Sequence, residues 1–249
     1  MNKAASVRTF ILLIVVFGVL AGVTIFLPQG TASTPIQTAP LPAPLPVVAL
    51  VSGALVVVVY GTLGLLGLFL ARKIGLPEIW DAAVTTRQRF LIPALAGVAV
   101  AVVLIAGDLF FSRINGIGHF PHPPFPTSIV AAITAGIGEE TLFRLFFISF
   151  WTWLVSKVIL RGRFLNVVYW VFSVLSAVAF GMSHLPAIMF LQNWTSVAQV
   201  PPFLLIELLL LNGVLSLVAA YYFKKSGFLA PVGVHLWADM VWHVLWGML

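Results

Sequence analysis

Seven long apolar runs constrain the fold of this chain more than any other feature of its sequence. The runs cover residues 9–27, 47–71, 90–111, 127–156, 164–184, 201–223 and 228–249. A helix of about 20 apolar residues crosses the hydrocarbon core of a bilayer, and each run is close to that length or longer. Only 8% of the 249 residues are charged, whereas soluble domains carry about 25%. The sequence therefore predicts an all-α, polytopic transmembrane bundle of about seven helices.

The positions of the basic residues predict how these runs are oriented. Outside the runs, every Lys and Arg except Arg113 falls at residues 3–8, 72–89, 157–163 or 224–225. These four groups lie before the first run and in every second connection between runs, so they all fall on one side of the membrane. Because Lys and Arg are retained in the cytoplasm, we expect the N-terminus there, in a prokaryotic cell membrane. Residues 9–27 also resemble a signal peptide with a cleavage site at 30–32. Their apolar core exceeds the roughly 7–15 residues of such signals, so an uncleaved helix is favoured.

Two parts of the chain are expected to form one integrated membrane domain. Residues 1–126 hold three runs and a proline-rich connection at 28–46, and residues 127–249 hold four runs. Cysteine is absent, so a thiol nucleophile, a thiolate metal site and disulfides are excluded. The net charge of +6 reflects topology, so the expected partner is the lipid bilayer and not a nucleic acid.

Two adjacent carboxylates and an arginine interrupt the fourth run, at Glu139, Glu140 and Arg144. Charged groups at membrane depth are costly, and they are usually paired and functional. Glu140 and Arg144 are four residues apart and can pair on one helix face. Glu139 points about 100° away from Glu140, so it is the carboxylate that the arginine neutralises less.

Two later runs supply imidazoles and a third carboxylate. His184 ends the fifth run, while His235 and Asp239 lie four apart on one face of the seventh. A glutamate, a histidine and a water are enough for general-base hydrolysis. A second histidine with a hydrogen-bond donor can hold a developing oxyanion. Taken singly, each side chain also fits a packing role between helices.

Three further ionisable residues have simpler interpretations. Asp108 and Glu207 lie near the ends of their runs and are expected to reach the membrane interface. His243 continues the stripe of His235 and Asp239, but two tryptophans flank it near the end of the chain. We therefore expect His243 to be interfacial.

Together these motifs resemble the CPBP family of intramembrane proteases. This is the CAAX-protease, Abi and bacteriocin-processing group, which includes the Rce1-type prenyl-protein endopeptidases. Its pattern is Glu-Glu-x-x-x-Arg, then Phe-x-x-x-His, then His-x-x-x-Asn or Asp. The chain matches it at Glu139-Glu140 with Arg144, at Phe180 with His184, and at His235 with Asp239. The resemblance covers about residues 127–239, and it implies an Rce1-like core.

The resemblance implies a role for each matched residue. Glu139 and His184 would activate a water, while His235 and Asp239 would support the oxyanion. The supporting residues would be Glu140 and Arg144, which position the site, and Phe180, which packs it. The implied activity is that of an endopeptidase, a hydrolase that cuts a membrane-associated peptide or protein.

Asp239 stands where Rce1-type members carry Asn, and an ionised Asp cannot donate to an oxyanion. It is either protonated, or orients His235, or ligates a metal. Glu139, His184, His235 and Asp239 would make a plausible zinc set. The glutamate–water scheme needs no metal, so no cofactor is required and zinc remains an alternative.

Two other functions use the same residues. A non-catalytic scaffold or bacteriocin-immunity-type protein would use them as a buried polar network. A proton-coupled transporter would use them as a relay, although no internal repeat is visible.

The depth of the site is a separate question. Glu139 lies 18 residues before Lys157, about 27 Å by helical rise. Either the fourth helix tilts or extends beyond the bilayer, or the site opens away from the cytoplasm.

Overall fold

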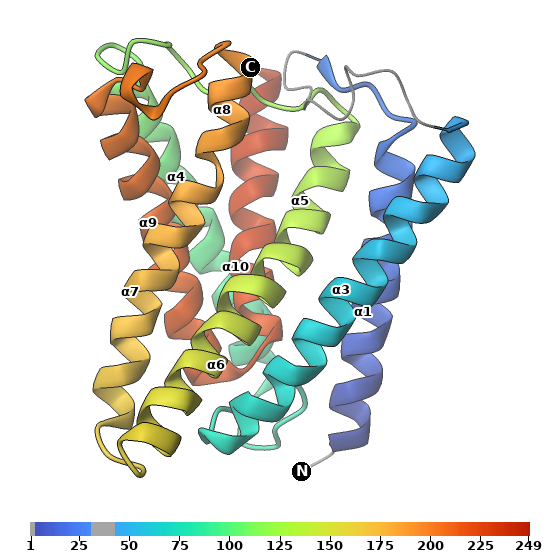
Figure 1. Cartoon of the computed structure of the whole chain (residues 1–249), viewed down its shortest axis with the longest axis vertical. Helices are drawn as coiled ribbons and strands as arrows, with labels where there is room; N and C mark the ends of the chain where they lie inside the picture. Colours follow the sequence, from blue (N-terminus) through green and yellow to red (C-terminus); the bar gives the residue numbers. More distant parts are fainter. Residues whose placement is uncertain (1–2, 31–42) are drawn as a thin grey trace.

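The chain folds into a bundle of long helices in a computed structural model that describes residues 3–30 and 43–249 (Figure 1). The first two helices form an antiparallel hairpin, α1 (Lys3–Thr24) and α3 (Leu45–Lys73). Most of the predicted proline-rich connection, at 31–42, lies outside the described residues, as does part of the possible cleavage site.

The remaining helices follow in chain order. The third run forms η2 (Arg87–Leu91) and α4 (Ile92–Phe111), and the fourth forms α5 (Thr127–Glu139), η3 (Glu140–Ile148), α6 (Ser149–Thr152) and η4 (Trp153–Ile159). Then come α7 (Leu165–Ser183), α8 (Leu185–Leu191), η5 (Val197–Gln199) and α9 (Pro202–Ser226). The chain ends with α10 (Leu229–Asp239), η6 (Met240–Leu245) and η7 (Trp246–Met248).

Six of these helical segments are long and apolar enough to cross a membrane. They correspond to the first six predicted runs, and the described residues contain no strand, so the all-α polytopic bundle is confirmed. The seventh run also folds as a helix, but α10 and η6 together are shorter than the six spanning segments. The fifth run was predicted to end at residue 184, but a further helix, α8, continues the segment from Leu185 to Leu191.

The seventh helix occupies the centre of the bundle, where α10 contacts α4, α5 and α9 (Figure 1). One close approach depends on a glycine. A Cβ added to Gly97 of α4 would lie 2.2 Å from the carbonyl oxygen of Val234 in α10. Because Gly97 has no side chain, α4 packs closely against α10, the helix that carries His235.

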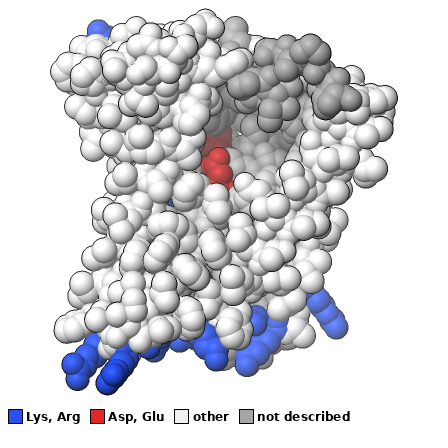
Figure 2. Space-filling view, viewed as in Figure 1, with Lys and Arg blue, Asp and Glu red and all other residues white. Residues whose placement is uncertain are grey.

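Charge divides the bundle into two ends (Figure 2). The Lys and Arg side chains visible on this face gather mainly at the end where the N-terminus lies. Acidic atoms are visible instead inside a hollow in the other half of the molecule. The two ends of the bundle therefore differ in both charge and shape.

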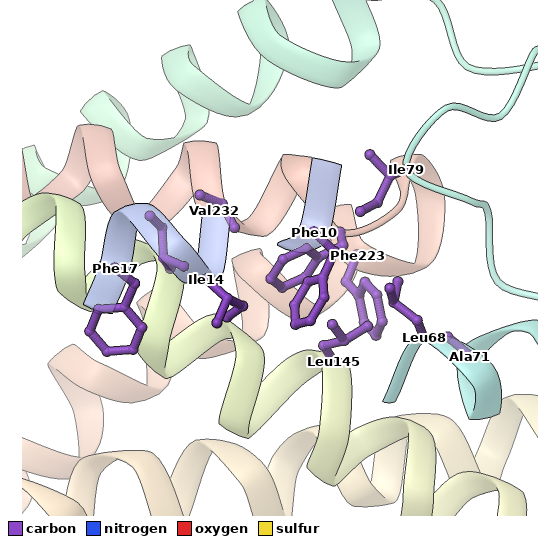
Figure 3. Close-up of a cluster of buried hydrophobic side chains, with 11 residues drawn as sticks. Phe10, Ile14, Phe17, Leu68, Ala71, Ile79, Leu145, Phe223 and Val232 are labelled. Carbon is purple, nitrogen blue, oxygen red and sulfur yellow. The ribbon is translucent and has the colours of Figure 1, made fainter. Parts of the chain in front are cut away.

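The N-terminal hairpin and the later helices share one apolar core (Figure 3). Phe10 and Phe17 of α1 pack with Leu68 of α3, Leu145 of η3 and Val232 of α10. Burying large side chains excludes lipid and water from the cluster. The same packing reaches the acidic segment, because a Cβ on Gly138 would lie 2.5 Å from Cζ of Phe17.

Candidate active site

A cavity of about 340 Å³ lies between α5, α7, α9 and α10. The predicted residues Glu139, His184, His235 and Asp239 all line it, together with Phe180. The structure thus brings together side chains from three helices that are up to 100 positions apart in sequence. Their catalytic roles stay predictions.

Both carboxylate-bearing helices change their winding at the site. The α-helix α5 ends at Glu139 and continues as the π-helix η3 from Glu140, and α10 ends at Asp239 and continues as the π-helix η6. Such π segments widen a helix by one residue per turn and often occur at functional sites. Here they determine how the side chains on either side of each junction are directed.

Glu140 connects the two halves of the site. Its carboxylate accepts a hydrogen bond of 2.7 Å from Nδ1 of His235, and it forms a 3.2 Å ion pair with Nε of Arg144. Glu140 and Arg144 are fully buried. The predicted pairing across four residues is therefore present. Glu140 also pairs with His235, which Asp239 would orient in one of its three predicted roles.

Arg144 is held by more than its carboxylate partner. Its guanidinium lies over the ring of Phe180, 4.7 Å from the centroid. This cation–π contact compensates part of the cost of burying the charge. None of its three side-chain nitrogens has a hydrogen bond of normal geometry among the described residues. The ion pair and the ring thus account for the position of the arginine.

Glu139 is less constrained than its neighbour, as its predicted direction implies. Its side chain is 34% exposed, and the nearest ionisable partner atom is Nε2 of His235 at 3.6 Å. Oδ2 of Asp239 approaches the same nitrogen at 3.5 Å. Both separations exceed a normal hydrogen bond, so both carboxylates keep capacity to bind something in the cavity.

His184 is oriented by its own helix turn. Its Nδ1 lies 2.9 Å from the carbonyl oxygen of Phe180. A carbonyl only accepts, so Nδ1 donates and Nε2 is the acceptor of the neutral ring. The ring of Phe180 packs edge-on against both His184, at 5.0 Å, and His235, at 5.7 Å. Phe180 therefore contacts both imidazoles.

The proposed zinc ligands do not form a metal site in this arrangement. Across residues 3–30 and 43–249, no group of three or more His, Asp or Glu side chains has the geometry to hold a metal ion. A zinc site needs three or four donors about 2.0–2.3 Å from one point. We therefore derive no step through a metal.

Two residues that sequence reasoning did not assign to the site also line the cavity. Asn212 of α9 donates to the carbonyl oxygen of Leu208 at 2.8 Å. It is a lone amide in a long apolar run, and this could have identified it from the sequence.

His243 was expected at the interface, but it lies on the cavity wall instead. Its Nδ1 is 3.0 Å from Nδ1 of His122 in the loop after α4. Burial lowers the pKa of His122, which favours the neutral ring needed to share that hydrogen bond.

Asp108 and Glu207 were wrongly expected to reach the interface. Both are fully buried, and both hold the loop at residues 112–126. Asp108 contacts His119 Nδ1 at 2.5 Å and accepts from the Phe120 amide at 3.1 Å. Glu207 accepts from Asn115 Nδ2 at 2.7 Å. We name Asp108, Asn115, His119 and Glu207 the loop-anchor group. It fixes the loop whose Phe120, Pro121 and Pro123 line the cavity.

The fold and the cavity define a polytopic membrane protein with a buried acid–imidazole site. Residues 121–241 match the family model Rce1-like, which is described as type II CAAX prenyl endopeptidase Rce1-like. This region contains all three motifs, and the match supports the CPBP/CAAX protease family for this part of the chain. No curated protein and no solved structure matches the chain.

Proposed function

We propose that the chain is an intramembrane endopeptidase that hydrolyses a peptide bond in a membrane-associated peptide or protein. One observation carries the proposal: Glu139 and His184 lie on the wall of one cavity that also exposes His235 and Asp239. A partly exposed carboxylate without a close partner is free to take a proton from water. The family match supports the same class of reaction.

The reaction divides between two pairs of side chains. Glu139 accepts a proton from the attacking water, and the water oxygen bonds to the carbonyl carbon of the substrate. Nε2 of His184 accepts a hydrogen bond from the other hydrogen of the water. The C–N bond then breaks, and the proton held by Glu139 passes to the leaving amine. General acid–base steps of this kind contribute about 10²–10⁴-fold each.

His235 is placed to stabilise the oxyanion. Its Nδ1 donates to Glu140, so Nε2 is the ring nitrogen left to act on the substrate, and the ring acts here in its protonated form. Nε2–H of the protonated ring can then donate to the developing charge. Asp239 lies 3.5 Å from the same nitrogen and balances the positive charge. No cofactor takes part in this scheme.

The experiment that tests the proposal compares two isosteric variants of the full chain in proteoliposomes. Wild type, Glu139→Gln and Glu207→Gln are incubated with a library of apolar membrane-associated peptides, and products are identified by mass spectrometry. Glu207 is a matched control because it is a fully buried glutamate that does not line the cavity.

We expect cleavage by wild type and Glu207→Gln, and a loss of about 10²–10⁴-fold in Glu139→Gln. Undiminished turnover by folded Glu139→Gln would contradict the mechanism. If no protein cleaves any peptide while Glu139→Gln unfolds, the non-catalytic network is the better account.

A further inference from the structure

The two ends of the bundle differ sharply in basic charge. Of the 13 Lys and Arg residues, Arg113 lies at the end opposite the N-terminus and Arg144 lies inside. The other eleven lie at the beginning of α1, around the α3–η2 connection, around the η4–α7 connection and at the end of α9. They are Lys3, Arg8, Arg72, Lys73, Arg87, Arg89, Lys157, Arg161, Arg163, Lys224 and Lys225. Such retention of positive charge marks the cytoplasmic side of a membrane protein.

The cavity belongs to the opposite half. Glu139 is 12 residues after Thr127 and 18 before Lys157, so along its own helix it lies closer to the end without the basic cluster. The cavity wall includes Phe120 and Pro123 from the loop at residues 112–126, which follows α4 at the end away from the basic residues. The hollow with acidic atoms in Figure 2 lies in the same half.

Small side chains keep this half of α5 open. Ala131, Ala135 and Glu139 line the cavity at four-residue intervals, so they share one helix face. The two alanines leave space between the carboxylate and the end of the bundle without basic residues. An extended peptide segment beside this face of α5 would meet no large α5 side chain between Ala131 and Glu139.

The chemistry of the wall limits what enters. Most lining side chains are apolar, and no Lys or Arg is among the described residues that form the wall. A free substrate carboxylate would face Glu139 and Asp239 without a permanently charged basic partner, which is unfavourable in a low dielectric. The wall suits an internal peptide bond between uncharged side chains.

Given the endopeptidase function proposed above, we infer that the substrate is an apolar peptide segment presented from the non-cytoplasmic side. Its scissile bond lies in the outer half of the bilayer. Such a segment belongs to a translocated or membrane-anchored polypeptide. Of the two alternatives that the sequence left for the fourth helix, the site therefore opens away from the cytoplasm.

The first test uses the natural absence of cysteine. Ala82→Cys and Ala198→Cys each place a single thiol at an exposed alanine outside the cavity, at opposite ends of the bundle. Intact cells are treated with a membrane-impermeant maleimide before and after permeabilisation. Ala198→Cys should be labelled in intact cells, and Ala82→Cys only after permeabilisation. The reverse pattern overturns the inference.

The second test separates this inference from the proposed function. Two model substrates carry the same susceptible apolar sequence in the outer or the inner half of one transmembrane helix. We expect the outer placement to be cleaved at least about tenfold faster, since misplacement of a reacting bond lowers rate strongly. Faster cleavage of the inner placement overturns the inference while the endopeptidase function stands. Cleavage of neither overturns both.

Discussion

Two groups of polar side chains hold carboxylates inside this bundle, and they differ in what surrounds them. The cavity group faces a space of about 340 Å³ and consists of Glu139, His184, His235 and Asp239. The loop-anchor group is fixed to a loop by side-chain contacts, and Asp108 and Glu207 in it are fully buried. Burial of charge in a membrane helix is therefore a weak sign of catalysis by itself. Access to a cavity is what separates the two groups.

The largest effect is expected where the cavity group depends on its buried ion pair. Arg144→Met removes the guanidinium and leaves the fully buried Glu140 carboxylate with His235 alone. Removing one partner of a buried pair typically costs about 3–5 kcal/mol. Thermal unfolding in detergent should show a large fall in Tm. Arg113→Met, at an exposed arginine, is the control and should change Tm little.

A smaller effect is expected from the loop-anchor group. Asp108→Asn keeps the shape but loses the charge that contacts His119 and the Phe120 amide. We expect a loss of about 1–3 kcal/mol in unfolding free energy, as for a weakened buried hydrogen bond. The kcat of the folded fraction should stay close to wild type. A fall in kcat as deep as that of Glu139→Gln would erase the distinction between the two groups.

The smallest effect is expected within the cavity group itself, at Asp239→Asn. The family pattern accepts either residue, and an amide can donate directly to an oxyanion. Cleavage kinetics should therefore change by no more than about tenfold, or 1.4 kcal/mol. Asp239→Ala removes both the negative charge and the hydrogen-bonding group, so its cleavage rate should fall much further. Equal losses in Asn and Ala variants would show that the negative charge of Asp239 is essential.

Much of the fold was predictable because lipid imposes simple rules on sequence. Four of the six spanning helices begin and end within three residues of the predicted runs, since apolar length decides both. The first begins six residues earlier than predicted, and the fifth continues seven residues further, through α8. The pairing of Glu140 with Arg144 was also predictable, because it is local to one helix. The bond between Glu140 and His235 was not, because it joins residues 95 positions apart.

The remaining errors have a common physical cause. Position near a helix end indicated interfacial residues at Asp108, Glu207 and His243, but a folded loop covers that end of the bundle. Sequence periodicity assumes regular α-helices, and so it also missed the π segments that begin after Glu139 and Asp239. Both errors concern tertiary packing, which no local pattern records.

The central claim is that the acids and imidazoles of the cavity group surround a shared water. A high-resolution crystallographic map of the full chain in lipid tests it most directly. The account predicts an ordered water within about 2.6–3.2 Å of both Glu139 and His184. A cavity filled by acyl chains, with the Glu139 carboxylate turned away from both histidines, would contradict it.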